Sequence, residues 1–183
     1  MRKHNLAFID LEMTGFLPDK HEIIEVGCII VRQDTGVDGK TRFEIVDECE
    51  FKIRPERITD ADPLSLKIAG YDPSEWKDAF SLREGMELFA EKTKDTIMVA
   101  HDMARDFCFL EKAYVKTGVV NTMHYHKLDT ISIAFAKLYD DPAVDKFSLR
   151  SLCEYLQVSN TRPHRALSDA KATFEVYQKL MEL

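Results

Sequence analysis

The sequence is poor in the features that mark several common protein classes. Its 183 residues include only four cysteines, at positions 28, 49, 108 and 153, and no CxxC motif. We therefore expect reduced thiols in a cytoplasmic protein, not a disulfide framework or a cysteine-based zinc site. No apolar run reaches the roughly 18 residues that a membrane-spanning helix needs. The opening MRKHNLAFID also lacks the continuous apolar segment of a signal peptide. We expect no membrane association.

The sequence also contains no recognisable linker, and it has fewer basic than acidic residues. There is no internal repeat, low-complexity tract or Pro/Ser-rich stretch, so we expect one domain over residues 1–183. The net charge is −7, from 25 basic and 32 acidic residues. Tight binding to long duplexes depends on neutralising phosphates, so this balance argues against it. The negative charge is still compatible with an enzyme that acts on short nucleic acids. Acidic residues gather at a metal site, and short substrates need few basic contacts.

The pattern of apolar residues predicts an α/β fold. Residues 23–31 (IIEVGCIIV) are almost wholly apolar, as in a central strand, whereas residues 43–53 alternate as in a half-buried antiparallel strand. Three antiparallel strands followed by alternating helices and strands predict a mixed sheet flanked by helices. We expect strands at 5–12, 23–31, 43–53, 96–100 and 125–128. We expect helices at 63–70, 82–94, 103–118 and 148–156, one after Asp129, and one at the carboxyl end.

The first strand carries two acids in an apolar run, NLAFIDLEMTG (5–15). Side chains alternate along a strand, so Asp10 and Glu12 point to the same face. Two carboxylates this close repel each other, and each raises the pKa of the other unless a divalent cation lies between them. The alternative is an edge strand whose two acids are solvated. DxE by itself is a weak motif and leaves both interpretations open.

Two later segments add further acids. Asp106 lies near the start of the helix that follows the buried strand TIMVA (96–100), and Asp169 lies in the opening turn of a helix preceded by His164. Carboxylate oxygens suit Mg²⁺ or Mn²⁺ better than zinc. Two such ions about 4 Å apart can stabilise both the attacking and the leaving oxygen of a phosphoryl displacement. Four carboxylates are a reasonable ligand set for two ions.

This set of residues resembles the DEDDh exonucleases. IDLEMTG (9–15) with IIEVG (23–27) is similar to the first motif of that superfamily, AHDMARDFCFL (100–110) to the second, and HRALSDA (164–170) to the third. The segment SLRSLCEYLQV (148–158) is similar to the usual approach to the third motif. The resemblance spans nearly the whole chain and implies a ribonuclease H-like mixed sheet.

The resemblance also implies roles for individual residues. Asp10, Glu12, Asp106 and Asp169 would be catalytic residues that bind two Mg²⁺ or Mn²⁺ ions. Within this set Asp10 would bridge both ions. Glu12 and Asp169 would serve the ion that activates water, and Asp106 the other. His164 would be the general base that takes the proton from the attacking water, a role that suits an imidazole near neutral pH.

The expected substrate-binding residues are Thr14, Gly15, Phe16, Asp102 and Arg105. Thr14 could offer a hydroxyl and an N–H to the 3′ end, and Gly15 would let the backbone approach it. Phe16 either packs on a base or belongs to the core. Asp102 and Arg105 depart from the family pattern, which has Asn and Phe at these places. Asp102 either caps the following helix or faces the substrate, where Arg105 would offset its charge.

The implied activity is that of a metal-dependent 3′–5′ exonuclease. It would hydrolyse phosphodiester bonds at the 3′ end of single-stranded DNA or RNA and release nucleoside 5′-monophosphates. DLEMTG (10–15) and HYHKLDT (124–130) are more similar to oligoribonuclease, whereas HRALSDA is more similar to DNA exonucleases associated with polymerases, which we favour slightly. A homodimer and a polymerase partner are both compatible with the family. The alternative from another class is a catalytically silent end-binding or scaffold module of the same fold.

Overall fold

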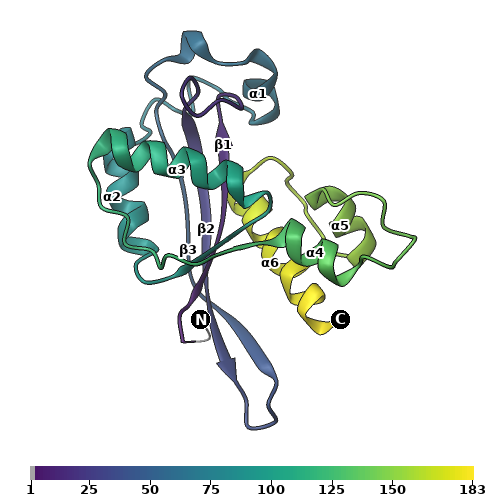
Figure 1. The fold of residues 1–183 in the computed structure, drawn as a ribbon. Helices are drawn as coiled ribbons and strands as arrows, with labels where there is room; N and C mark the ends of the chain where they lie inside the picture. Colours follow the sequence, from purple (N-terminus) through teal and green to yellow (C-terminus); the bar gives the residue numbers. More distant parts are fainter. Residues whose placement is uncertain (1–2) are drawn as a thin grey trace.

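The protein folds around one five-stranded mixed sheet, seen in a computed structural model that describes residues 3–183 (Figure 1). Its strands occur in the order β3-β2-β1-β4-β5. The pairs β1–β2 and β2–β3 are antiparallel, whereas β1–β4 and β4–β5 are parallel, so the predicted mixed sheet is confirmed. The strands are β1 (Leu6–Met13), β2 (Ile23–Thr35), β3 (Thr41–Lys52), β4 (Ile97–Ala100) and β5 (Lys127–Asp129).

Six α-helices flank the sheet in the part of the chain that the structure describes, and the expected helices are all present. They are α1 (Pro63–Ile68), α2 (Leu82–Lys92), α3 (Met103–Thr117), α4 (Thr130–Lys137), α5 (Leu149–Leu156) and α6 (Ala166–Glu182), with a short 3₁₀ turn at Ile58–Asp60. Serine caps open α2 and α5, where Ser81 and Ser148 accept hydrogen bonds from backbone N–H groups of the first turn. Within residues 3–183, none of the helices has the length and apolar character that crossing a membrane requires.

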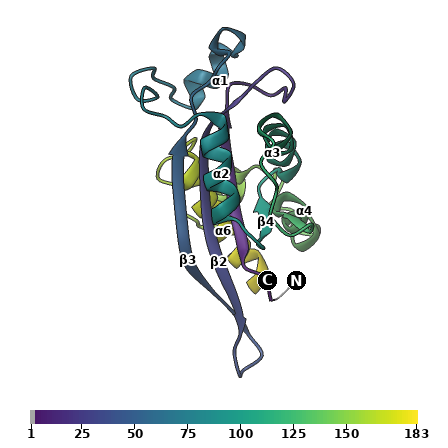
Figure 2. The same cartoon turned by 90° about the vertical axis from the view of Figure 1, so that its left-hand side faces the viewer.

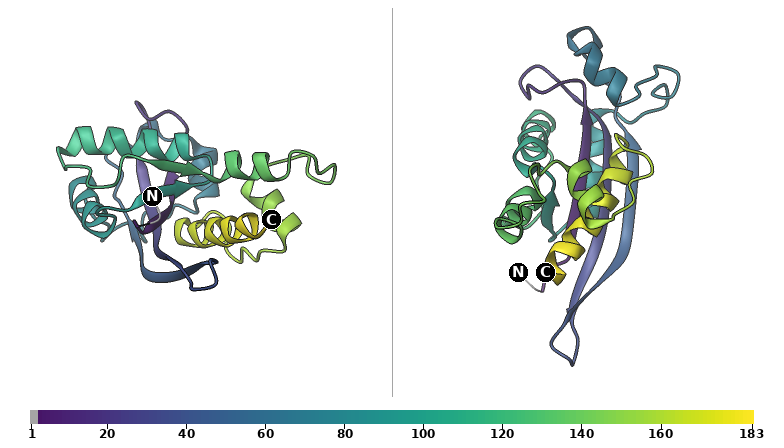
Figure 3. Two further views of the ribbon diagram at one scale, coloured as in Figure 1. Left: turned by 60° about the horizontal axis from the view of Figure 1, so that its bottom comes forward. Right: turned by 90° about the vertical axis from the view of Figure 1, so that its right-hand side faces the viewer.

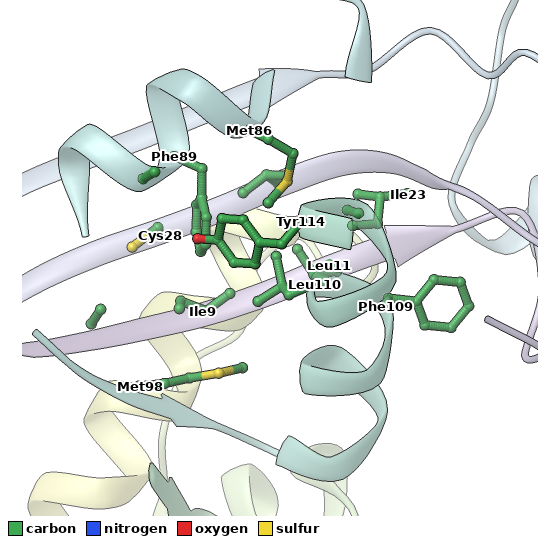
Figure 4. Close-up of a cluster of buried hydrophobic side chains, with 14 of the residues drawn as sticks. Ile9, Leu11, Ile23, Cys28, Met86, Phe89, Met98, Phe109, Leu110 and Tyr114 are labelled. Carbon is green, nitrogen blue, oxygen red and sulfur yellow. The ribbon is translucent and has the colours of Figure 1, made fainter. Parts of the chain in front are cut away.

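The two faces of β1 bury different side chains, as its alternation predicts. Ala7, Ile9 and Leu11 face a core formed with α2 and α3, which Figure 4 shows in close-up. Leu6 and Phe8 face α6, where Phe8 packs edge-on against Tyr177 at a ring-centroid distance of 5.3 Å. Asp10 and Glu12 continue this second face. Their strand is therefore buried on both sides, and the interpretation as a wet edge strand is wrong.

Helices α4 and α5 lie beside α6 at one side of the sheet. They pack beside α6, through a third apolar cluster that includes Ala134, Leu152 and Val176 (Figure 3). At the other side, the β2–β3 hairpin projects beyond the rest of the sheet (Figure 2). The sheet on one side and the α4–α5 pair on the other thus pack against α6 from two directions.

The first turn of α6 lies directly against the backbone of β2. A Cβ atom at Gly27 would come within 2.0 Å of the Ala166 carbonyl carbon, so only glycine allows this approach. Beside it, buried Glu25 accepts a hydrogen bond from the Ala166 N–H (3.0 Å) and pairs with Arg165 (3.4 Å). The Arg165 side chain makes no cap of its own. Glu25 therefore satisfies one of the free N–H groups that every helix start leaves.

The segment between β3 and α2 lies at the end of the sheet opposite the hairpin tip (Figure 1). The sole tryptophan anchors it, because Trp76 is 2% exposed and its indole N–H donates to the Ile24 carbonyl at 2.8 Å. Tyr71 packs against the indole ring, and the Lys52 ammonium lies 4.1 Å from the ring centroid. This small core places α1 beside the end of β1.

We predict that Gly27→Ala lowers the free energy of unfolding by at least about 2 kcal/mol, because the added methyl group displaces the start of α6. The control is Gly36→Ala, whose methyl group would meet only the flexible ends of the Asp38 and Arg42 side chains, and which should change stability by less than about 0.5 kcal/mol. Urea unfolding followed by Trp76 fluorescence measures both. Equal stabilities of the two variants would contradict the close contact between Gly27 and the first turn of α6.

Candidate active site

The four acids predicted from the sequence converge where β1, α3 and α6 meet. Asp10 and Glu12 lie on the α6 face of β1, and Asp169 lies in the first turn of α6. Asp106 arrives from a different element. Strand β4 runs parallel to β1, with Phe8 opposite Val99, so the chain that leaves β4 starts α3 near the end of β1 and brings the charge of Asp106 close to Asp10. Pairing of distant segments thus brings the carboxylates together.

Their pKa values show the electrostatic cost of this arrangement. Removal from water, with the nearby charges of Asp106 and Asp169, raises the pKa of Asp10 well above its usual range. Burial and then Asp169 raise the pKa of Glu12 to about 8, despite the opposing charge of Arg165. Burial likewise raises the pKa of Asp106 to about 8. A cation between the carboxylates would remove this penalty.

His164 lies just before α6, and Asp169 lies in the first turn of this helix. Both residues belong to the acid cluster that contains Glu12. Ligand atoms of Glu12, His164 and Asp169 all lie within 4.8 Å of one another. The backbone N–H of His164 donates to Oδ2 of Asp169 at 3.0 Å, while the imidazole stands in an exposed loop. His164 has a φ of 63°, a left-handed conformation that few non-glycine residues adopt, although asparagine, aspartate and histidine adopt it more often than the others. The structure holds this residue in a strained loop beside the acids, which is typical of functional sites.

Two residues that support the site were missed by the sequence analysis. The Asn160 side-chain amide donates to Oδ1 of Asp169 at 2.5 Å, and the Ser168 hydroxyl donates to Oδ1 of Asn160 at 2.8 Å. Both oxygens of Asp169 therefore have a donor. Nothing in the sequence marks Asn160, because the loop before α6 has no regular period that predicts its contacts.

Glu25, a third missed residue, has a signal in the sequence. It is an acid inside an apolar strand, like Asp10, and is 1% exposed. It stands directly opposite Glu12 in the β1–β2 register. Burial raises its pKa, and the hydrogen bond from Ala166 opposes the shift. Applied to IIEVG, the argument that singled out Asp10 and Glu12 would have found Glu25.

The turn after β1 is built differently from the expectation. The Thr14 N–H donates to the Glu22 carbonyl (2.9 Å), so the prediction that it is offered to substrate is wrong. The Thr14 hydroxyl accepts from the Glu22 N–H at 2.9 Å and keeps only its hydrogen to donate. Gly15 is required by a neighbouring side chain, because a Cβ there would lie 2.4 Å from the His21 ring.

Phe16 and Arg105 form the rim of the site. Phe16 is 61% exposed, so the interpretation as a core residue is wrong. The Arg105 guanidinium lies 5.4 Å from the Phe16 ring centroid and forms an ion pair with Asp102. Both Phe16 and Arg105 line one cavity with Asp10, Glu12, His164 and Asp169. An aromatic face and a cation thus lie beside the acids.

Asp102 occupies the position before α3 but does not cap it. Its backbone is left-handed (φ 63°), and its side chain makes no hydrogen bond to the first turn. Instead Asp129 caps two helices, accepting from Met103 N at 3.2 Å and from Ser132 N at 2.9 Å. The capping interpretation of Asp102 is therefore wrong. His101 has a structural role, because its ring nitrogens form hydrogen bonds with Thr130 Oγ1 and the Phe147 carbonyl.

We predict that the free energy of unfolding of the metal-free protein falls as the pH rises from about 5 to about 8. Carboxyl groups whose pKa is raised by folding contribute fully below their ordinary pKa, and the contribution is lost as they ionise near pH 8 in the folded state. Urea unfolding in EDTA, followed by Trp76 fluorescence, measures the effect. Asp10→Asn should show a weaker pH dependence and be more stable near pH 8 by about 1–2 kcal/mol. A wild-type stability that rises over this range would contradict the prediction.

Comparisons with known proteins identify the family to which the chain belongs. The model of the exonuclease family RNase_T matches residues 7–177. Among curated proteins, a PolC-type DNA polymerase III from Caldanaerobacter subterraneus subsp. tengcongensis is 32% identical over 176 residues, which are 94% of this chain and 11% of that protein. The DNA polymerase III subunit epsilon of Aquifex aeolicus is 30% identical over 174 residues, 95% of this chain and 79% of the subunit.

Solved structures show the same fold at lower identity. Exonuclease I of E. coli in complex with a dT13 oligonucleotide superposes with a TM-score of 0.76 at 16% identity, covering 98% of this chain and 41% of that one. The chain spans only about a tenth of the length of the PolC-type relative. The motifs, the ribonuclease H-like sheet and the family match together confirm the predicted resemblance: the chain belongs to the exonuclease family, within the DEDDh group of 3′–5′ exonucleases.

Proposed function

We propose that residues 1–183 act as one exonuclease domain that hydrolyses the last phosphodiester bond at the 3′ end of a single strand. The product would be a nucleoside 5′-monophosphate. The observation that carries the proposal is that Asp10, Glu12, His164 and Asp169 line one cavity, with Asp106 near enough to raise the pKa of Asp10. The raised pKa values of Asp10, Glu12 and Asp106 show what this arrangement costs. Such a cluster has a clear use in catalysis and none in packing.

The chemistry of the four acids fits two Mg²⁺ or Mn²⁺ ions. Hard oxygen ligands and a clustered negative charge are what these ions require, and the single imidazole nearby does not suit a zinc site. When bound, the ions would stabilise the charge that develops on the attacking and leaving oxygens. The hydrogen bonds from Asn160 and His164 N–H would hold Asp169 in a fixed orientation for this task.

His164 would act as the general base. Its ring lies in an exposed loop, so it can exchange the proton that it takes from water with solvent. Its backbone is anchored by the bond to Asp169, which fixes the loop near the acids.

The rim residues would bind the terminal nucleotide. The exposed Phe16 ring offers a face for a base, and Arg105 offers a cation to a phosphate. Asp102 pairs with Arg105 and offsets its charge. Gly15 lines the same cavity, and the neighbouring Thr14 is buried, with its hydroxyl accepting a hydrogen bond from the Glu22 N–H.

DNA is the favoured substrate. Two of the similar proteins are named as DNA polymerase III components, and the superposed exonuclease I was crystallised with a DNA oligonucleotide. RNA, as for oligoribonuclease, is the alternative. The same names support a polymerase partner in the bacterial cytoplasm. A homodimer is supported only by the resemblance to family members that dimerise. A catalytically silent module is the alternative from another class, and the intact acid cluster argues against it.

We predict that 5′-labelled single strands shorten from the 3′ end in Mg²⁺ or Mn²⁺, and that EDTA stops the reaction. DNA and RNA strands of one sequence are compared side by side. Replacement of His164 by Ala should slow hydrolysis by about 10²- to 10⁴-fold while leaving Mn²⁺ binding intact. Strand binding without shortening in either metal would instead favour the silent module.

We predict that Asn160→Ala weakens Mn²⁺ binding by about tenfold or more, because Asp169 loses the donor that orients it. Ser168→Ala keeps the Asn160 amide and should have a smaller effect. Calorimetric titration of Mn²⁺ into each folded variant measures this. Wild-type affinity in Asn160→Ala would show that the amide does not position Asp169.

A further inference from the structure

Cys28 and Cys49 face each other across strands β2 and β3, on the α2 side of the sheet. They are direct partners in the antiparallel register. Directly opposed residues of antiparallel strands have Cα atoms about 4.5–5.5 Å apart. A disulfide closes over Cα distances of about 4.4–6.8 Å. The backbone therefore already holds the two cysteines at a spacing that a disulfide accepts.

The two thiols differ in exposure and in their partners. Cys28 is fully buried beneath α2, whereas Cys49 is partly exposed. The Cys28 thiol hydrogen-bonds to the Cys49 sulfur, an interaction that raises the pKa of Cys28 and lowers that of Cys49. The ammonium of Lys92, which pairs with Asp47 at 2.7 Å, also favours the Cys49 thiolate. The accessible sulfur is thus the nucleophile, and the buried one lies against it.

The remaining cysteines provide an internal comparison. Cys108 is exposed on α3, and Cys153 is buried in α5. Burial raises the pKa of Cys153 to about 11, which makes its thiol unreactive. Cys108 is accessible but lies on a helix, where it has no directly opposed strand partner. Only the β2–β3 pair combines access with a partner thiol.

We propose that Cys28 and Cys49 form a redox-sensitive dithiol that peroxide converts to an intramolecular disulfide. The Cys49 thiolate attacks one oxygen of hydrogen peroxide; an S–O bond forms, the O–O bond breaks, and the leaving hydroxide takes a proton from solvent and becomes water. The Cys28 sulfur then attacks the sulfur of the Cys49 sulfenic acid; the S–S bond forms, the S–O bond breaks, and the leaving hydroxide takes the Cys28 thiol proton and becomes a second water. The two sulfurs supply the two electrons that reduce the peroxide.

The disulfide would join strands whose relative position matters elsewhere. Strand β2 also carries Glu25 and Gly27, which seat the start of α6. Closing the loop between residues 28 and 49 restricts the unfolded chain, so oxidation should raise the unfolding temperature. Cross-strand disulfides at accessible positions are readily reduced, so the modification should be reversible by a dithiol reductant.

Peptide mapping of the full-length protein tests the proposal. The protein is treated with hydrogen peroxide, free thiols are blocked with iodoacetamide, and the chain is digested with trypsin. Cleavage after Lys20, Arg32, Arg42 and Lys52 places the two cysteines in peptides 21–32 and 43–52. We expect a cross-linked pair of these peptides that dithiothreitol separates. Cys108→Ser should give the same pair.

Variants of Cys28 and Cys49 test which of the two thiols reacts with peroxide first. Cys28→Ser should leave Cys49 as sulfenic or sulfinic acid, and Cys49→Ser, at the partly exposed position, should leave Cys28 unoxidised. The proposal is overturned if the wild-type protein yields oxidised Cys49 with alkylated Cys28. It is equally overturned if Cys108 is oxidised first and peptides 21–32 and 43–52 stay unlinked. Neither outcome depends on exonuclease activity.

Discussion

The burial of several carboxylates close together is the constraint around which this fold is arranged. Asp10, Glu12 and Asp106 all have raised pKa values because burial disfavours ionisation, and at Asp10 and Glu12 repulsion by neighbouring carboxylates adds to the shift. The structure holds them together with rigid elements: β1 is a central strand, and two helices begin beside it. Apolar packing on both faces of the sheet supplies the stability that offsets the repulsion. Divalent cations would offset it directly.

The start of α6 shows how packing becomes chemistry. Gly27 lets the helix touch the backbone of β2, and Glu25 satisfies its first N–H. These contacts fix Asp169 in the first turn, and Asn160 then orients its carboxylate. His164 is attached to the same carboxylate through its backbone. One glycine and one buried acid in β2 therefore determine where two residues of the site lie, far along the sequence.

The sequence allowed much of this to be predicted. Alternation in β1 placed Asp10 and Glu12 on one face, and periodic apolar residues located the helices that carry Asp106 and Asp169. What local patterns could not supply were contacts between segments distant in sequence. Asp129 caps α3 in place of Asp102 because parallel pairing of β4 and β5 brings it there. The Thr14 N–H donates its hydrogen bond to the Glu22 carbonyl across a turn, and Phe16 is exposed although it is apolar. Each of these depends on tertiary position, not on local preference.

Crystals soaked in Mn²⁺ would test the central claim most directly, by anomalous diffraction with a nucleoside 5′-monophosphate present. We predict two manganese peaks about 4 Å apart among the carboxylates of Asp10, Glu12, Asp106 and Asp169. Absence of manganese from this cleft, or a single ion bound elsewhere, would contradict the account of the acids as a two-metal site.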